Sequence, residues 1–73
     1  MVIDPEAFGR NLKRILREKG MTQRELAKKL EMQNMSVWKW CNGHYLPSLD
    51  NFAILVKMLN VSAEDLIEGI VKE

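Results

Sequence analysis

The chain has 73 residues, enough for one hydrophobic core but not for two, so we expect a single domain over residues 1–73. Its composition, 47% hydrophobic and 29% charged, is typical of a helical domain and excludes a disordered tail. One cysteine and one histidine exclude an internal disulfide and a structural zinc site, and favour the reducing cytoplasm as the location. No run approaches the roughly 18 apolar residues of a membrane span, and no cofactor or small-molecule ligand is expected.

The formal net charge of +1 hides a strong asymmetry along the chain. Residues 1–40 contain nine Lys or Arg and five Asp or Glu, whereas residues 41–73 contain two and five. The two parts therefore have net charges of +4 and −3. The basic part is expected to face any polyanionic partner.

The first helix is predicted to begin at Asp4, because this capping residue is followed by Pro5 and by the acidic Glu6. Gly20 is expected to end it. Its basic residues occupy the positions between the apolar ones, which predicts a basic amphipathic helix. The apolar residues at helical spacing are Phe8, Leu12, Ile15 and Leu16.

The second helix has a well-marked start at Thr22. Thr22 and Glu25 form a capping box, and Met21 and Leu26 flank it as a hydrophobic staple. The apolar side of this helix continues through Leu26, Ala27 and Leu30.

Residues 31–34 interrupt the apolar pattern before a third short helix. Val37 and Trp40 resume the helical spacing, which closes at Asn42 and Gly43. Two short helices are therefore expected about one turn apart.

Two further helices are predicted after the loop that ends at Pro47. Ser48 caps an apolar segment over residues 49–59, which we expect to be the centre of the core. Ser62, followed by acidic residues in the first turn, begins the last helix. No strand is predicted, so the expected fold is all-α with five helices.

Residues 21–43 read MTQRELAKKLEMQNMSVWKWCNG and resemble the helix-turn-helix unit of the phage repressor and Cro (Xre-type) family. The likeness continues without a gap through LPSLDNFAILVKMLNVSAEDLIEG and spans residues 8–69. The resemblance implies a lambda-repressor-like five-helix domain with its helix-turn-helix unit at about 22–42. It also implies a sequence-specific, double-stranded DNA-binding transcriptional regulator, with repressor the favoured sign.

The two helices of such a unit must cross closely, and Ala27 supplies the small side chain for the crossing. If Val37 and Trp40 face the core, a turn of 100° per residue places the opposite face of the third helix outward, where it can enter a major groove. The candidate base-reading residues are Asn34, Met35, Ser36, Trp38 and Lys39.

The resemblance also implies phosphate contacts at the start of the second helix and after the third. Gln23 could instead be a solvated surface residue, and His44 is favoured as a phosphate neighbour over a catalyst. The candidate phosphate-binding residues are Gln23, Arg24, Asn42, Gly43, His44 and Tyr45.

Several candidate base readers have alternative roles. Lys39 could hold a guanine or a phosphate. Asn34 could read adenine, but capping of the third helix is favoured because Gln33 is a poor cap. Met35 and Trp38 could touch thymine methyl groups, or Trp38 could be buried in the core or under a dimer contact.

The chain departs from the family pattern at two places. Many members have glycine where this chain has Glu31, so the turn is expected to differ slightly here. Many also pair an arginine with a glutamate at the positions of Leu16 and Cys41. Because both charges are replaced together, we predict that Leu16 packs against Cys41 and that Cys41 is structural rather than reactive.

The sequence offers no paired acids, no ligand cluster and too little chain to enclose a pocket, so we do not expect an enzyme. The alternative to a DNA-binding regulator is a protein-interaction module that uses Met35 and Trp38 as an apolar anchor. On a palindromic operator we expect a homodimer. Ile67, Ile70 and Val71 could pair across its two-fold axis or could simply cover the first helix.

Overall fold

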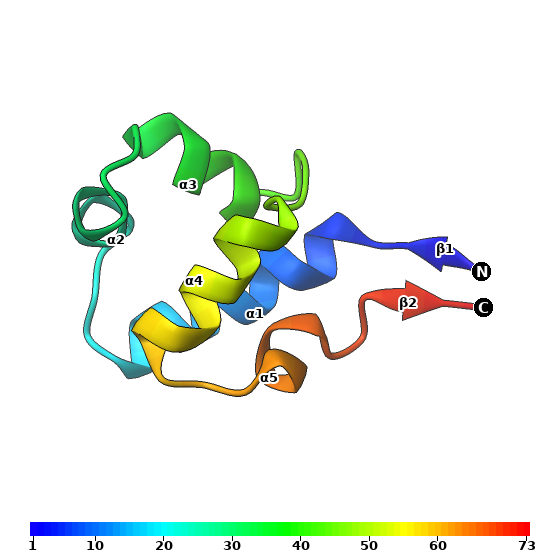
Figure 1. Cartoon of the computed structure of the whole chain (residues 1–73). Coiled ribbons are helices and arrows are strands. Elements are labelled where there is room, and N and C mark those ends of the chain that lie inside the picture. The colour runs from blue at the N-terminus through cyan, green and yellow to red at the C-terminus, as the bar shows by residue number, and fades with distance from the viewer.

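Five helices and one two-stranded ribbon make up the protein in a computed structural model that describes residues 1–73 (Figure 1). The five predicted helices are all present. Their bounds, with those of the strands, are β1 Val2–Ile3, α1 Pro5–Glu18, α2 Gln23–Lys29, α3 Asn34–Cys41, α4 Leu49–Leu59, α5 Ala63–Ile67 and β2 Val71–Lys72.

The helix starts follow the capping residues of the sequence. Asp4 Oδ1 accepts a hydrogen bond of 3.0 Å from the Glu6 amide at the start of α1. Thr22 and Glu25 exchange the two bonds of a capping box, with lengths of 2.9 and 3.0 Å. Ser62 makes a second capping box at the start of α5.

The centre of the core is α1, and the prediction that residues 49–59 form it is wrong. In α4 only Leu55 and Leu59 are fully buried, and Leu49 is 80% exposed. The apolar residues of α4 surround much of its circumference, whereas only one side of the helix meets the core. The buried residues of α1 are Ala7, Phe8, Gly9, Asn11, Leu12, Ile15 and Leu16.

A close approach between α1 and α3 depends on Gly9. A Cβ atom at this position would lie 2.4 Å from the Cys41 carbonyl oxygen and 2.8 Å from that of Trp40. Since real Cβ atoms do not come so near to backbone, only glycine allows the two helices to pack at this distance. Ala27, which is fully buried, is the small residue on α2 that the sequence predicted for the helix-turn-helix crossing.

Buried Asn11 attaches α5 to α1. Its side-chain Nδ2 donates to the carbonyl oxygens of Leu66 at 2.8 Å and Glu68 at 2.9 Å, which are among the last carbonyls of α5. Ile70 packs against the core beyond them. The C-terminal segment therefore covers α1, one of the two arrangements that the sequence left open.

The two ends of the chain pair as an antiparallel ribbon that projects from the helices (Figure 1). Val2 is opposite Lys72, and the Lys72 ammonium lies 3.0 Å from the Asp4 carboxylate. The hydrogen bond from Lys72 holds the pKa of Asp4 below its usual value. The prediction of no strand is wrong, because two-residue strands are too short to show an alternating pattern.

Glu31 has a φ of +56°, in the left-handed region, in the turn between α2 and α3. The turn therefore keeps the conformation for which family members use glycine, and the expectation of a different turn is wrong. The hydrogen bonds from Glu31 N to Lys28 O and from Met32 N to Ala27 O fix this conformation. A residue with a Cβ atom is strained there by roughly 1 kcal/mol.

The Glu31→Gly variant is expected to be more stable than the parent chain by up to about 1 kcal/mol, because glycine adopts a positive φ without a Cβ clash. Denaturant or thermal unfolding measures the difference. The Glu31→Ala variant is the matched control, since it removes the same carboxylate but keeps the Cβ atom. Equal stability of the glycine and alanine variants would show that the turn is not strained.

Candidate nucleic-acid interface

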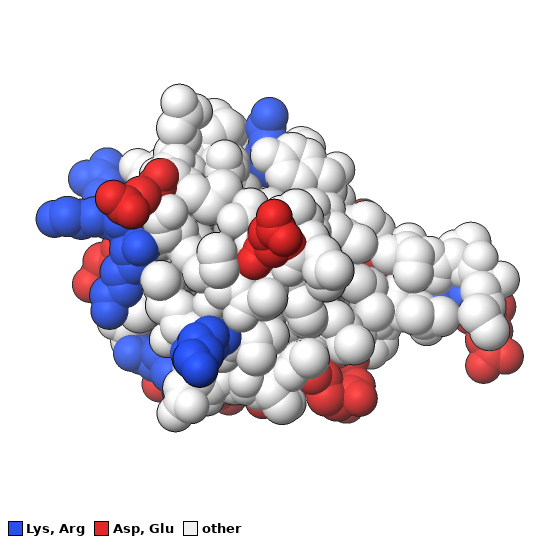
Figure 2. Space-filling view, viewed as in Figure 1, with Lys and Arg blue, Asp and Glu red and all other residues white.

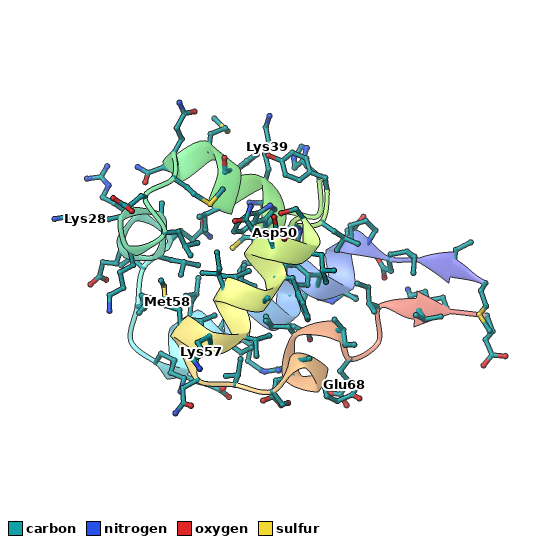
Figure 3. All side chains as sticks on the ribbon, in the orientation of Figure 1. Lys28, Lys39, Asp50, Lys57, Met58 and Glu68 are labelled. Atoms are coloured by element: carbon teal, nitrogen blue, oxygen red, sulfur yellow. The ribbon has the colours of Figure 1, made fainter.

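Helix α3 has one face in the core and the opposite face in solvent. Val37, Trp40 and Cys41 are at most 2% exposed. Met35 is 55% exposed and Trp38 44%, so the alternative in which Trp38 is buried in the core is wrong. Lys39 projects from α3 away from the body of the molecule (Figure 3). The orientation derived from the helical period is therefore confirmed.

Asn34 does not cap α3, and the capping interpretation is wrong. Gln33 occupies the cap position with extended backbone, and neither it nor any other side chain makes a capping bond there. Asn34 is the first residue of the helix itself. The side chains of Gln33 and Asn34 are both exposed and make no hydrogen bond within the protein, so two amide groups are available at this end of α3.

The other base-reading candidates also have definite surroundings. Ser36 is half-buried and its amide bonds to the Gln33 carbonyl at 3.1 Å. The rings of Trp38 and His44 lie against each other at a tilt, with 5.1 Å between ring centroids and 35° between planes. The Lys39 ammonium lies 5.8 Å from the centroid of the Tyr45 ring. These contacts join the outward face of α3 to the segment that follows it.

The segment after α3 makes a tight turn with its own constraints. Gly43 has a φ of +72°, and a Cβ atom there would lie 2.5 Å from Glu6 Cγ. The amides of Gly43 and His44 donate to the Trp40 and Lys39 carbonyls, and Asn42 Nδ2 donates to the Trp38 carbonyl at 2.8 Å. These three donors, which were expected to contact phosphates, thus bond to carbonyls at the end of α3. The exposed side chains of His44 and Tyr45 are not used in this way.

Gln23 and Asn42 each border a polar hollow, and Lys13 of α1 lines both. One hollow, of about 280 Å³, lies between α1 and the start of α2, and the other, of about 290 Å³, lies between α1 and the end of α3. Sequence reasoning placed Lys13 only on the solvated side of α1. Arg24, the remaining candidate at the start of α2, is exposed.

Charge is unevenly distributed over the surface. In Figure 2, most of the visible Lys and Arg side chains gather on the side of the molecule where α2 lies, with acidic groups among them, and other acidic groups lie over α4 and beside α5. Part of the charge asymmetry of the sequence is therefore also seen on this face of the molecule, where the basic side chains gather at α2.

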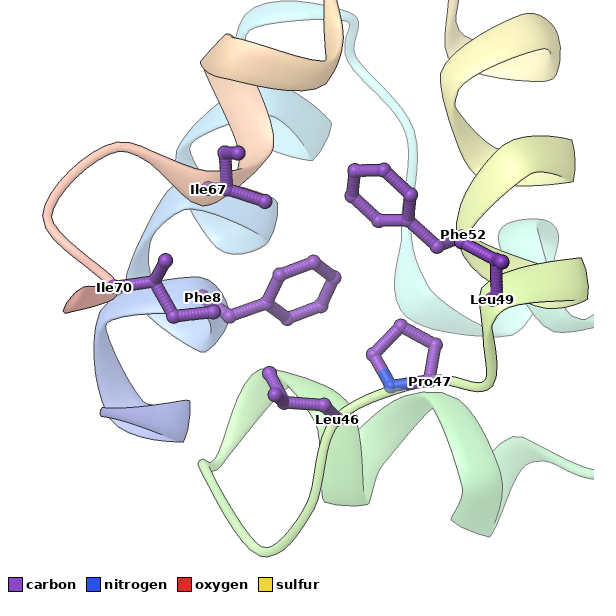
Figure 4. A pocket seen from close by; sticks show the side chains of 7 residues that line it. All are labelled: Phe8, Leu46, Pro47, Leu49, Phe52, Ile67 and Ile70. Carbon is purple, nitrogen blue, oxygen red and sulfur yellow. The ribbon is translucent and has the colours of Figure 1, made fainter. Parts of the chain in front are cut away.

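An apolar groove of about 290 Å³ lies between α1, α4, α5 and the loop before α4 (Figure 4). None of the sequence-predicted site residues lines it. Its lining residues are Phe8, Leu46, Pro47, Leu49, Phe52, Ile67 and Ile70.

The structure brings no three His, Cys, Asp or Glu side chains close enough to hold a metal ion. None of its helices has both the length and the apolar character needed to cross a membrane.

A family model described as HTH_3, helix-turn-helix, matches residues 12–66. The chain belongs to this helix-turn-helix family. The match includes α2, α3 and α4 in full, and with them the turn at Glu31. The family resemblance expected from the sequence is confirmed, as is the five-helix fold. No curated protein matches the chain.

Two solved structures resemble this helix-turn-helix protein. A transcriptional regulator from Listeria innocua is 27% identical, with a TM-score of 0.75 over 90% of this chain and 61% of its own. The SOS-response transcriptional repressor LexA from Eubacterium rectale is 26% identical, with a TM-score of 0.79 over 100% of this chain and 82% of its own. The helix-turn-helix protein thus spans less than two thirds of the Listeria regulator.

Cys41 of this helix-turn-helix protein lies in the same buried cluster as Leu16, where the family often has charged residues. Direct packing of the pair stays a prediction. Burial raises the pKa of the Cys41 thiol to about 11, and the charge of Lys13 offsets this only in part. The thiol is therefore protonated at neutral pH, as a structural cysteine should be.

Cys41 should react with a thiol reagent at pH 8 only after the protein has been unfolded. The unfolded chain releases the thiol proton at a lower pH than the folded one. The contribution of Cys41 to stability is therefore constant below about pH 8.5 and is lost as the pH rises toward 11. Unfolding of the parent and of Cys41→Val across this range measures it. A difference between the two that does not change with pH would contradict the raised pKa.

Proposed function

We propose that this protein is a sequence-specific, double-stranded DNA-binding transcriptional regulator that acts as a repressor in the cytoplasm, with α3 in the major groove. One observation carries the proposal. The chain is a helix-turn-helix family member whose α3 is fixed by its inner face and leaves Met35 and Trp38 exposed, with the half-buried Lys39 next to them. A major groove admits an α-helix in this orientation, with side chains of the outer face against base edges.

Polar readout is assigned to three side chains of α3 and to Gln33, which directly precedes the helix. Lys39 can donate to guanine O6 and N7, and the Tyr45 ring beside its ammonium restricts where it points. Asn34 has its amide free and can bond bidentately to adenine N6 and N7. Gln33 can make the same contact and is added to the candidates. Ser36, half-buried, is placed to accept or donate at the edge of the groove.

Phosphate contacts are assigned on both sides of α3. Gln23 and Arg24 lie on one side. On the other side are the side chains of His44 and Tyr45 and the Tyr45 amide, which makes no hydrogen bond within the backbone. Asn42 joins them through the second hydrogen of its Nδ2, since the first bonds to the Trp38 carbonyl. Gly43 contributes through its positive φ, which shapes the turn, because its amide already donates to the Trp40 carbonyl. Lys13 is added to the phosphate-binding candidates, because one hollow that it lines borders Gln23 and the other borders Asn42.

The operator is proposed to be palindromic and bound by a homodimer, with half-sites about 34 Å apart so that two α3 helices enter successive major grooves on one side of the duplex. The apolar groove supplies a surface that a second copy can cover. Leu49, at its rim, is 80% exposed and Ile67 is 37% exposed. The alternative function, a protein-interaction module, would use Met35 and Trp38 instead.

Selection from a random duplex library, followed by affinity measurements at two salt concentrations, tests the proposal. The Lys39→Ala variant should lose about 10- to 100-fold in affinity for the selected duplex and relax its preference at one base pair of each half-site. Lys57→Ala is the matched control, because it removes the same charge at the end of α4 distant from Lys39 (Figure 3).

An enriched palindrome with spaced half-sites would support the dimer, and an enriched single half-site would contradict it. Failure to enrich any duplex at low salt would contradict DNA binding and favour the interaction module. Equal losses for Lys39→Ala and Lys57→Ala would show a charge effect without direct readout.

A further inference from the structure

We infer that Met35 and Trp38 recognise the C5-methyl group of a pyrimidine in the major groove, and this inference rests on the proposed function. The two side chains lie three residues apart, and so on one face of α3. That face also contains Lys39, but the helix has no acidic residue in its first turn. The surface is therefore apolar at Met35 and Trp38 and cationic next to them.

Both members of the pair are large apolar side chains that face solvent. Met35 is 55% exposed and Trp38 44%, although Val37 and Trp40 on the same helix are fully buried. Two large apolar groups side by side in water gain free energy when a partner covers them. The neighbouring polar groups, the free amides of Gln33 and Asn34 and the ammonium of Lys39, match base edges and phosphates, so the partner that fits the whole face is DNA.

Contacts within the protein hold Trp38 in position. The His44 ring lies against the indole at a tilt, with 5.1 Å between ring centroids, and Asn42 Nδ2 donates to the main-chain carbonyl of Trp38 at 2.8 Å. His44 itself is tied to α3 through its amide, which donates to the Lys39 carbonyl at 2.9 Å. The indole is supported on one side before DNA binds, so less side-chain freedom is lost on binding.

The chemistry of the groove then selects the ligand. Met35 has no hydrogen-bond donor and cannot read the polar edges of bases. The apolar group that a major groove displays is the C5-methyl of thymine, and methylated cytosine carries the same group at the same position. A side chain that covers this methyl removes it from water, and each methyl is expected to raise affinity about fourfold.

Base analogues in the selected duplex test the inference one atom group at a time. Deoxyuridine replaces each thymine in turn, which removes the methyl and keeps the pairing and the O4 acceptor. We expect the affinity of the parent protein to fall about fourfold at one or two positions of each half-site. In the Met35→Ala variant, the same replacement should not change the affinity at the position that Met35 contacts. In the Trp38→Ala variant, it should not change the affinity at the position that Trp38 contacts.

Two further arms complete the design. The Lys39→Ala variant is the control. In this variant, each loss of affinity on replacing thymine by deoxyuridine should remain. At each sensitive position, C·G and 5-methylcytosine·G pairs are compared with T·A. An approximately fourfold preference for 5-methylcytosine over cytosine supports the methyl as ligand. If the duplex with 5-methylcytosine·G binds more tightly than the duplex with T·A, the natural ligand is the methyl group of methylated DNA. If the duplex with T·A binds more tightly, the natural ligand is the methyl group of thymine.

The failures are distinguishable. If no duplex is enriched, the proposed function fails and the inference with it. If a defined duplex is enriched but uracil is neutral at every position, the methyl readout is overturned and the proposed function stands. A uracil penalty that persists in both alanine variants also overturns it. If Trp38→Ala does not fold, Met35→Ala alone decides the result, because the side chain removed there is exposed.

Discussion

At Gly9 the backbone of α1 lies against the carbonyl groups at the end of α3, and no side chain fits between them. This contact determines the distance between the two helices, and the burial of Val37, Trp40 and Cys41 determines the rotation of α3 about its axis. A helix held at a fixed distance and rotation has one free face. The candidate interface consists of that face and the residues next to it.

Further parts of the structure extend this constraint to the surroundings of α3. The left-handed turn at Glu31 brings α3 back across α2, and the one at Gly43 places His44 and Tyr45 beside the outward face. Asn11 attaches α5 to the far side of α1 and completes the core without touching the interface. Basic side chains gather on the side of α2, which packs against α3, so the charge near the candidate interface favours a polyanionic partner.

Local signals in the sequence were enough to predict the five helices and the rotation of α3. Thr22 and Ser62 act within their own turns, and Val37 and Trp40 share one face of a single helix. The terminal ribbon was not predictable in this way, because its strands come from opposite ends of the chain. Asn34 was misassigned because the cap position is set by the backbone at Gln33, one residue earlier. The roles of Gly9 and Lys13 depend on which helices are neighbours, information that spacing along one helix does not contain.

The outward face of α3, with the residues beside it, is proposed as the DNA interface. Titration of ¹⁵N-labelled protein with the selected duplex, followed by amide resonances, tests it most directly. The largest changes are expected at residues 33–39 and 42–45 and around Gln23, with small changes in the second half of α4 and in α5. The largest changes around Leu49, Phe52 and Ile67 would place the nucleic acid in the apolar groove and contradict the account.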